Sequence, residues 1–127
     1  MVFKRLIKKM QKDYIVKRVD GIELPSFNEG KLIREHIVFT GRVQKIGFRM
    51  EMNLIAQRIG LTGWVKNNDS GSVEAEVQGD KDKIDFLKQQ MKSLKRAKVS
   101  HIETRELQVE ENEKSFVVIR EDSITDF

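Results

Sequence analysis

The sequence predicts an α+β domain in which two helices cover one face of an antiparallel sheet. Two segments with apolar residues at helical spacing, one after residue 47 and one after Asp80, predict the helices. Short apolar or alternating runs before, between and after them predict strands. The resulting order is β-α-β-β-α-β, the split βαβ arrangement of ferredoxin-like folds. Because this fold hosts many unrelated activities, the function has to be argued from a site.

The first strand and the first helix enclose a glycine-containing loop. Residues 36–40 (HIVFT) are mostly apolar, with β-branched and aromatic members, as expected for a buried central strand. The apolar residues of the helix share one face, and Gly60 follows them as a stop signal. These apolar residues are Phe48, Met52, Ile55, Ala56 and Ile59. The sequence thus places a loop between a buried strand and an amphipathic helix.

The next elements are a hairpin, the second helix and the last strands. Residues 61–67 and 72–78 flank the segment 68–71 (NDSG), whose glycine can take the left-handed conformation of a tight turn. Asp80 is placed to cap a helix with an apolar stripe. The stripe consists of Ile84, Leu87, Met91 and Leu94. Residues 99–109 and 116–119 are then expected as the last strands, joined by a polar turn at 110–114.

The composition excludes several classes of protein and site. The 127 residues have room for one domain, and 39% hydrophobic with 35% charged residues is typical of a soluble globular protein. The absence of cysteine excludes disulfides, thiolate zinc sites and cysteine nucleophiles. No apolar run is long enough to span a membrane, and the N-terminus lacks the pattern of a signal peptide. We therefore expect a cytoplasmic protein without a membrane span.

Residues 1–34 differ from the rest of the chain in charge. They contain nine Lys or Arg and four acidic residues, whereas residues 35–127 contain 15 and 16. We therefore expect a basic N-terminal extension, residues 1–34, attached to a domain of residues 35–127. Within the extension, apolar residues at positions 2, 3, 6, 7 and 10 share a helical face. Residues 14–24 are then expected to form a small hairpin about Asp20-Gly21, and residues 25–30 a linker.

Two interpretations of the extension are open. In the first, it packs on the domain or on a second copy of the chain. In the second, its positive charge contacts nucleic acid or an anionic membrane, which salt-sensitive binding would reveal. The expected assembly is a monomer or a weak homodimer, and nucleic acid is the less favoured partner of residues 1–34.

The segment 41–49 (GRVQKIGFR) is the first candidate site. The first N–H groups of a helix lack partners and the helix dipole is positive there, so a loop that enters a helix can bind an anion. Gly41 and Gly47 let such a loop curl so that successive amides point inward. Arg49 adds a planar, permanently charged guanidinium suited to phosphate. A plain strand-to-helix turn with a surface arginine would show the same pattern.

Asn67, at the end of the following strand, is the second candidate. In the expected topology this strand end lies near the loop, so the side-chain amide could face a bound anion. An amide can accept a hydrogen bond from one water molecule and donate another to it. Alternatively, Asn67 and Asn68 simply open the hairpin, a common use of asparagine. His36 and His101 have no carboxylate cluster at ligand spacing, so no metal site is expected.

The loop and a second segment together resemble the acylphosphatase family. The family pattern is a GxVQGVxFR loop followed by LGLxGWVxN and a DGxVE hairpin; the chain has GRVQKIGFR and then, at residues 59–80, IGLTGWVKNNDSGSVEAEVQGD. The similarity covers about residues 36–120, with both motifs in the right order. It implies an enzyme without metal or cofactor that hydrolyses the carboxyl-phosphate bond of acyl phosphates to carboxylate and orthophosphate.

The resemblance also implies roles for individual residues. The family's catalytic arginine falls on Arg49, and its catalytic asparagine falls on Asn67, which would hold the attacking water. The phosphate would be bound by the arginine together with the amides of the loop. The candidate phosphate-binding residues are Val43, Gln44, Lys45, Ile46, Gly47, Phe48 and Arg49.

Lys45 departs from the family pattern, which has glycine at this position. A residue with a side chain is disfavoured there if the backbone needs a positive φ. Either the phosphate cradle is slightly deformed, or Lys45 extends into solvent and adds positive charge near the anion. The alternative function is therefore a catalytically weak phosphate- or nucleic-acid-binding module on the same fold. The sequence does not name the physiological acyl group.

Overall fold

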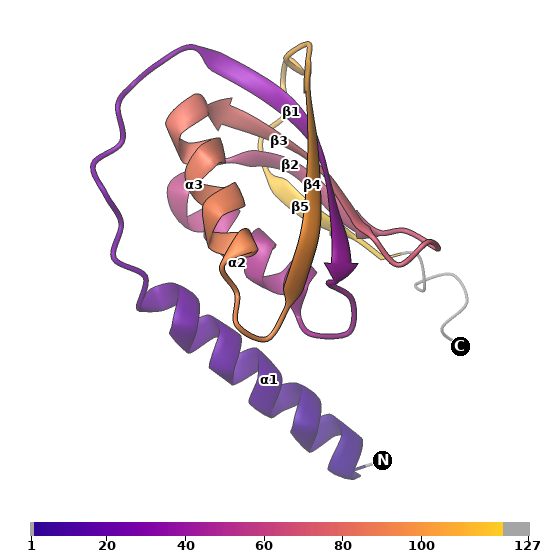
Figure 1. Cartoon of the computed structure of the whole chain (residues 1–127). Coiled ribbons are helices and arrows are strands. Elements are labelled where there is room, and N and C mark those ends of the chain that lie inside the picture. The colour runs from indigo at the N-terminus through magenta and orange to yellow at the C-terminus, as the bar shows by residue number, and fades with distance from the viewer. Residues whose placement is uncertain (1, 121–127) are drawn as a thin grey trace.

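Residues 2–120, which the computed structural model describes, form three helices and five strands. They are α1 (Val2–Asp20), β1 (Leu32–Arg42), α2 (Phe48–Ile59), β2 (Thr62–Asn67), β3 (Val73–Asp80), α3 (Lys81–Lys92), β4 (Lys98–Leu107) and β5 (Phe116–Ile119). The strands form one sheet in the order β4-β1-β3-β2-β5, and α2 and α3 lie on one of its faces (Figure 1). The predicted α+β class and the β-α-β-β-α-β order are confirmed.

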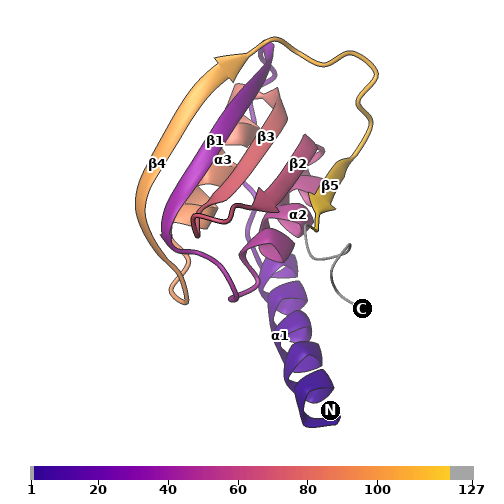
Figure 2. The ribbon, with the colours of Figure 1, turned by 90° about the vertical axis from the view of Figure 1, so that its right-hand side faces the viewer.

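The sheet is mixed rather than antiparallel throughout. Three strand pairs, β1–β3, β1–β4 and β2–β3, are antiparallel, whereas the edge strand β5 runs parallel to β2. The expected turn at residues 110–114 does not join neighbouring strands, because β4 and β5 lie at opposite edges of the sheet. The connecting chain instead crosses the end of the sheet (Figure 2). β5 still runs opposite to β4, as in a hairpin, but the crossing places it beside β2 instead of β4.

Polar contacts of Arg34 and Gln78 hold the crossing segment to the sheet. Arg34 is 2% exposed, and its guanidinium donates to Glu76 at 2.9 Å and to Glu113 at 2.8 Å. The side-chain amide of Gln78 donates to the carbonyl of Glu110 at 3.0 Å and accepts from its N–H at 2.7 Å. Because these groups are largely buried, their hydrogen bonds fix where the crossing segment lies and thereby place β5.

The expected hairpin at residues 14–24 was wrong, because α1 continues as a helix to Asp20. Ile15 and Val19, one helical turn apart, are 0% and 2% exposed, and α1 packs against α2. Burying each of these side chains stabilises the fold by roughly 1.5–3 kcal/mol, whereas the propensity cost of a β-branched residue in a helix is below about 1 kcal/mol. Gly21 ends the helix, and its N–H donates to the carbonyl of Lys17 at 3.1 Å.

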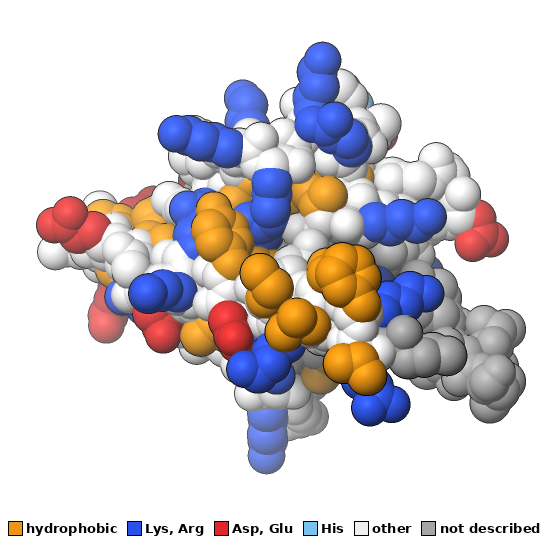
Figure 3. All heavy atoms as spheres, turned by 90° about the horizontal axis from the view of Figure 1, so that it is seen from below, with side chains coloured by type: hydrophobic (Ala, Val, Ile, Leu, Met, Phe, Trp, Pro, Cys, Tyr) orange, Lys and Arg blue, Asp and Glu red, His pale blue; other side chains and the backbone are white. Residues whose placement is uncertain are grey.

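The first half of α1 presents an exposed apolar face. The helical face expected for the extension is confirmed. Its side chains, Val2, Phe3, Leu6, Ile7 and Met10, are all exposed. Seen from below, hydrophobic side chains gather on this side of the molecule among those of Lys and Arg (Figure 3). Within residues 2–120, no helix, α1 included, is long and apolar enough to cross a membrane.

The remaining helix ends follow the predicted signals with one difference. Gly60 follows α2 in the left-handed conformation, with φ 78°, and its segment closes the helix through backbone hydrogen bonds, as expected for a glycine stop. Asp80 occupies the N-cap position of α3, but its side chain makes no capping hydrogen bond. Its carboxylate lies instead 4.0 Å from the ammonium of Lys83, one turn into the helix.

Candidate active site

The loop between β1 and α2 is anchored in the core at both ends. Val43 and Phe48 are 0% and 2% exposed, and the Phe48 ring packs edge-to-face on Phe39 with centroids 5.2 Å apart. Gly47 is the N-cap residue of α2, and no side chain caps the helix there. No side chain therefore caps the first-turn N–H groups of α2, which begin where the loop ends. This is the arrangement of an anion-binding turn.

Gly47 is the position where the loop touches α1. Its φ of 78° lies in the left-handed region, where a side chain is strained. A Cβ at this position would also collide with the Cδ1 atom of Ile15 in α1. The N-terminal helix thus packs directly on the backbone of the candidate phosphate loop, so residues far apart in the sequence share one site.

Lys45 adopts the backbone conformation that the family's glycine implies. Its φ is 66°, and Asn112, with φ 71°, is the only other non-glycine residue with positive φ in residues 2–120. The left-handed conformation costs a residue with a Cβ roughly 1–2 kcal/mol. The loop therefore keeps its curl at the expense of some stability. The side chain of Lys45 is exposed, and the residue lines the cavity described below.

We expect Lys45→Gly to stabilise the fold and weaken substrate binding. Relief of the left-handed strain exceeds the entropy cost of a glycine by about 0.5–1 kcal/mol, so the melting temperature should rise by a few degrees. Removing one exposed cation from the cavity lining should raise KM for an anionic substrate about two- to fivefold. Thermal unfolding and steady-state kinetics measure both effects.

Asn112→Gly is the matched control for this substitution. It relieves the same conformation outside the cavity lining, so it should leave KM unchanged. Because asparagine tolerates the left-handed region better than lysine, its stabilisation should also be smaller. A large increase in kcat for Lys45→Gly would instead mean that the lysine deforms the phosphate cradle.

Gln44 ties the loop to the hairpin that follows Asn67. Its side-chain amide donates to the carbonyl of Asn68 at 2.8 Å and to that of Ser72 at 2.9 Å. The turn itself is closed by the N–H of Asn68, which donates to the carbonyl of Ser72 at 2.9 Å. These bonds hold the end of β2 against the loop. The side chain of Gln44 thus stabilises the hairpin, whereas its backbone N–H is one of the candidate phosphate-binding amides.

A cavity of about 780 Å³ brings the two candidate catalytic residues together. Arg49, in the first turn of α2, and Asn67, the last residue of β2, both line it. Four of the other candidate phosphate-binding residues line it as well: Val43, Lys45, Gly47 and Phe48. Gln44 and Ile46 are absent from the lining. Each of these two has a different contact, Gln44 with the hairpin and Ile46 with an arginine behind the loop.

The opposite wall of the cavity is α1. The residues that α1 contributes are Phe3, Lys4, Ile7, Lys8 and Gln11. The cations of the whole lining are Lys4, Lys8, Lys45, Arg49 and Arg120, and the described lining contains no carboxylate. A cavity walled by one sign of charge attracts an anion and raises its local concentration. The basic composition of residues 1–34 was visible in the sequence, but nothing there placed α1 over the loop.

Arg49 also contacts the edge strand. Its Nη1 donates to the carbonyl of Ile119 in β5 at 3.3 Å. The side chain of Arg49 therefore links the start of α2 to the edge strand β5. The sequence did not predict that β5 lies beside β2, and so did not predict this contact. The position of β5 thus bears directly on where this candidate catalytic group lies.

A buried carboxylate with two arginines holds the loop from behind. Glu51 is 0% exposed; its Oε2 accepts from Nε of Arg18 at 2.8 Å and its Oε1 from Nη2 of Arg96 at 2.6 Å. Nε of Arg96 donates to the carbonyl of Ile46 at 2.7 Å. Sequence reasoning missed this network. Its signal was Glu51 itself, a charged residue on the apolar stripe of α2, where a buried ion pair is the usual explanation.

The two histidines are not among the residues that line the cavity. His36 lies on the sheet, with Nε2 2.6 Å from Oε2 of Glu74. The hydrogen bond from His36 holds the pKa of the Glu74 carboxyl below its usual value, although burial opposes this shift. His101 is an exposed residue of β4.

Comparison with known proteins shows which family the chain resembles. The family model described as acylphosphatase matches residues 35–118. The chain is 40% identical over 89 residues to an acylphosphatase of Bifidobacterium longum, covering 68% of this chain and 92% of the relative. It is 44% identical over 89 residues to an acylphosphatase of Geobacillus kaustophilus, covering 68% and 93%.

A solved structure shows the same arrangement of elements. The crystal structure of acylphosphatase from Bacillus subtilis superposes with a TM-score of 0.65 at 31% identity and covers 68% of this chain and 98% of that one. The family match begins at residue 35, so α1 lies outside it. On the strength of the matched residues, the two motifs and the shared fold, this chain belongs to the acylphosphatase family of hydrolases.

Proposed function

We propose that the chain hydrolyses acyl phosphates in the cavity between the loop, β2 and α1. The observation that carries the proposal is that Arg49 and Asn67, from different elements, line one cavity with the uncapped start of α2. The amides of residues 43–48 and the guanidinium of Arg49 bind the phosphoryl oxygens and stabilise the charge that develops on them. Asn67 holds the attacking water in line with the leaving group.

The chemistry needs few groups because the leaving group is a carboxylate. The water oxygen forms a bond to phosphorus while the bond from phosphorus to the acyl oxygen breaks, and that electron pair leaves with the carboxylate. No metal or general acid has to neutralise an alkoxide. Among residues 2–120, the cavity lining includes no carboxylate or histidine to act as a base, so the water proton passes to a phosphoryl oxygen. The products are a carboxylate and orthophosphate.

Turnover of a simple acyl phosphate tests the proposal. The purified full chain should release orthophosphate from acetyl phosphate in the presence of a chelator and without added cofactor. The variant with both Arg49→Ala and Asn67→Ala, prepared in the same way, controls for contaminating phosphatases. Saturable binding of acetyl phosphate without hydrolysis would instead identify the chain as a phosphate-binding module.

Asn67→Ala should lower kcat about a hundredfold and leave phosphate binding nearly unchanged. The reason is that Asn67 is assigned to the water and not to the phosphoryl group, so its loss removes positioning alone. The inhibition constant of orthophosphate reports binding separately from kcat. Asn53→Ala, on α2 but outside the cavity lining and hydrogen-bonded to the side chain of Gln57, is the matched control. A normal kcat for Asn67→Ala would show that the water is held elsewhere.

Further partners and the assembly are also part of the proposal. Lys4 and Lys8 of the basic helix line the substrate cavity, which favours a role in binding the substrate over a role in binding nucleic acid. We expect a monomer or a weak homodimer in the cytoplasm. Salt-dependent binding of RNA by the full chain, abolished by Lys9→Glu with Lys12→Glu, would favour the nucleic-acid alternative.

A further inference from the structure

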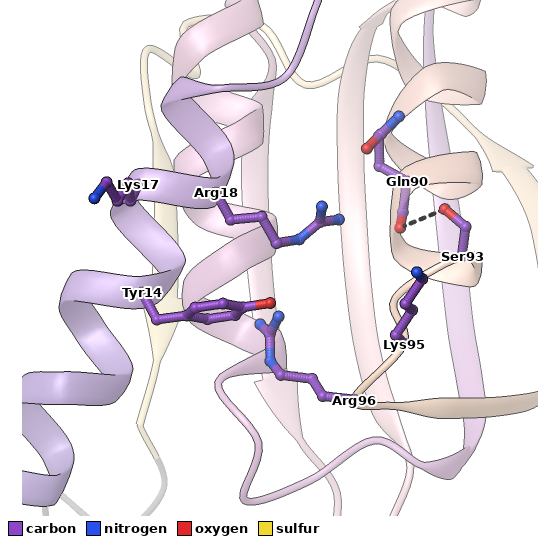
Figure 4. A pocket seen from close by; sticks show the side chains of 7 residues that line it. All are labelled: Tyr14, Lys17, Arg18, Gln90, Ser93, Lys95 and Arg96. Atoms are coloured by element: carbon purple, nitrogen blue, oxygen red, sulfur yellow. Dashed lines mark hydrogen bonds between the residues drawn. The ribbon is translucent and has the colours of Figure 1, made fainter.

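A second pocket, distinct from the catalytic cavity, lies between the C-terminal half of α1 and the end of α3. Its volume is about 480 Å³, and it shares no lining residue with the catalytic cavity. Four cations line it: Lys17 and Arg18 from α1, and Lys95 and Arg96 from the turn that precedes β4. Figure 4 shows Arg18 and Lys95 directed into the space between the two helices and Lys17 directed away at the rim.

The pocket carries more positive charge than the fold itself requires. Glu51 is the carboxylate that bonds two of these cations, Arg18 and Arg96. The C-terminal ends of α1 and α3 add about half a negative charge each. The lining is thus positively charged overall, which favours an anion such as a phosphate-type oxyanion.

The guanidiniums are held in place before any ligand arrives. Arg18 uses Nε for the fully buried Glu51, which leaves its two terminal nitrogens toward the pocket in Figure 4. Arg96 is fixed by Glu51 and by the carbonyl of Ile46, and it lies over the Tyr14 ring at 5.8 Å. Fixed planar donors bind an oxyanion with less loss of conformational entropy than mobile lysines do.

The end of α3 completes the polar lining. Gln90 also lines the pocket, and its side-chain amide can donate to an anion. The hydroxyl of Ser93 is directed back to the helix, where it bonds the carbonyls of Gln89 at 2.9 Å and Gln90 at 3.2 Å. The Ser93 hydroxyl therefore does not donate to a ligand in the pocket, and the available donors are the two arginines, Lys95 and the Gln90 amide.

We propose that this α1–α3 pocket binds a phosphate-type oxyanion, either free phosphate or the phosphate group of an organic molecule. Arg18, Lys95 and Gln90 donate to the oxyanion, and Arg96 supports it from the side of the catalytic loop. Because Arg18 belongs to α1, the site exists only in a chain that carries the N-terminal helix. A bound anion would also fasten α1 to the turn before β4.

Phosphate titration followed by NMR of backbone amides tests the pocket by location. Arg49→Ala in the full chain is titrated with inorganic phosphate and, separately, with phenyl phosphate, at ionic strength held constant with sodium chloride. We expect saturable shifts of the amides of Gln90, Ser93, Lys95 and Arg96. Similar affinities for the two probes identify free phosphate as the ligand, and an affinity at least about tenfold higher for phenyl phosphate identifies an organic phosphate.

Charge reversal at the pocket provides the matched comparison. Lys95→Glu should weaken phosphate binding at these amides about tenfold or more, because a charge-assisted contact is replaced by repulsion. Lys92→Glu makes the same charge change on an exposed residue of α3 outside the pocket, so it should change the affinity little. Equal affinities of the two variants would overturn the proposal. Shifts confined to the catalytic loop, or shifts that do not saturate, would overturn it as well.

Discussion

Arg49→Ala should lower kcat/KM for acetyl phosphate by roughly 100- to 1000-fold, the largest effect on activity that we expect from a single substitution. The guanidinium at the start of α2 is assigned to the oxygens on which charge builds up as the phosphorus bond to the acyl group breaks. Removing one donor of this kind from a preorganised site typically costs about 3–4 kcal/mol of transition-state stabilisation. Both kcat and the affinity for orthophosphate should fall, because the same group binds the phosphate in the ground state.

Two comparisons make the Arg49 result specific. Arg49→Lys keeps the charge but not the planar fork, so it should recover only part of the activity. Arg105→Ala removes an exposed arginine from β4, outside the cavity lining, and should be indistinguishable from the unaltered chain. If Arg49→Ala retained near-normal turnover while remaining folded, the phosphate would have to be held by the other cations of the cavity.

Glu51→Ala should destabilise the fold by about 2–4 kcal/mol, the largest effect on stability that we expect. Removing one partner of a buried ion pair costs about 3–5 kcal/mol when the remaining charge stays buried. Arg18 and Arg96 have 30% and 21% exposed side chains, so they can partly reach water and the cost is smaller. Urea unfolding measured by circular dichroism gives the free energy of unfolding directly.

Glu51→Ala should also loosen the catalytic loop and lower kcat. Without Glu51, the guanidinium of Arg96 is no longer fixed from two sides, and its hydrogen bond to the carbonyl of Ile46 should weaken. We therefore expect a lower kcat in Glu51→Ala at a temperature where the variant is still folded. Glu103→Ala, an exposed carboxylate of β4, is the control for both measurements. Unchanged stability would mean that the two arginines find equivalent partners in water.

Local patterns in the sequence were sufficient for the elements of the domain body. The apolar stripe of residues 48–59 and the glycine that follows it define α2, since helical periodicity and stop signals act within a few residues. The alternation in residues 73–77 likewise defines β3. These features need no knowledge of distant contacts. For the same reason the loop and Asn67, both carried by local motifs, were identified as candidates.

The errors arose where distant contacts decide the outcome. Residues 14–24 have the β-branched residues and the Asp-Gly pair of a hairpin, yet Ile15 and Val19 form a helix because α2 offers a surface to that spacing. β5 lies beside β2 instead of β4 because the chain crosses the end of the sheet, where Arg34 contacts the crossing segment. In both cases burial of distant partners outweighs local propensity, which is worth only tenths of a kcal/mol per residue.

The sequence by itself determined the family, the α+β order and the two motifs that carry Arg49 and Asn67, because each is written in residues close together in the chain. Only the tertiary structure decided that the basic helix α1 forms a wall of the cavity. It also decided that Glu51, Arg18 and Arg96 support the loop from behind. The physical reason is that these contacts join segments more than 30 residues apart, and burial and charge pairing across such distances leave no local periodicity to read.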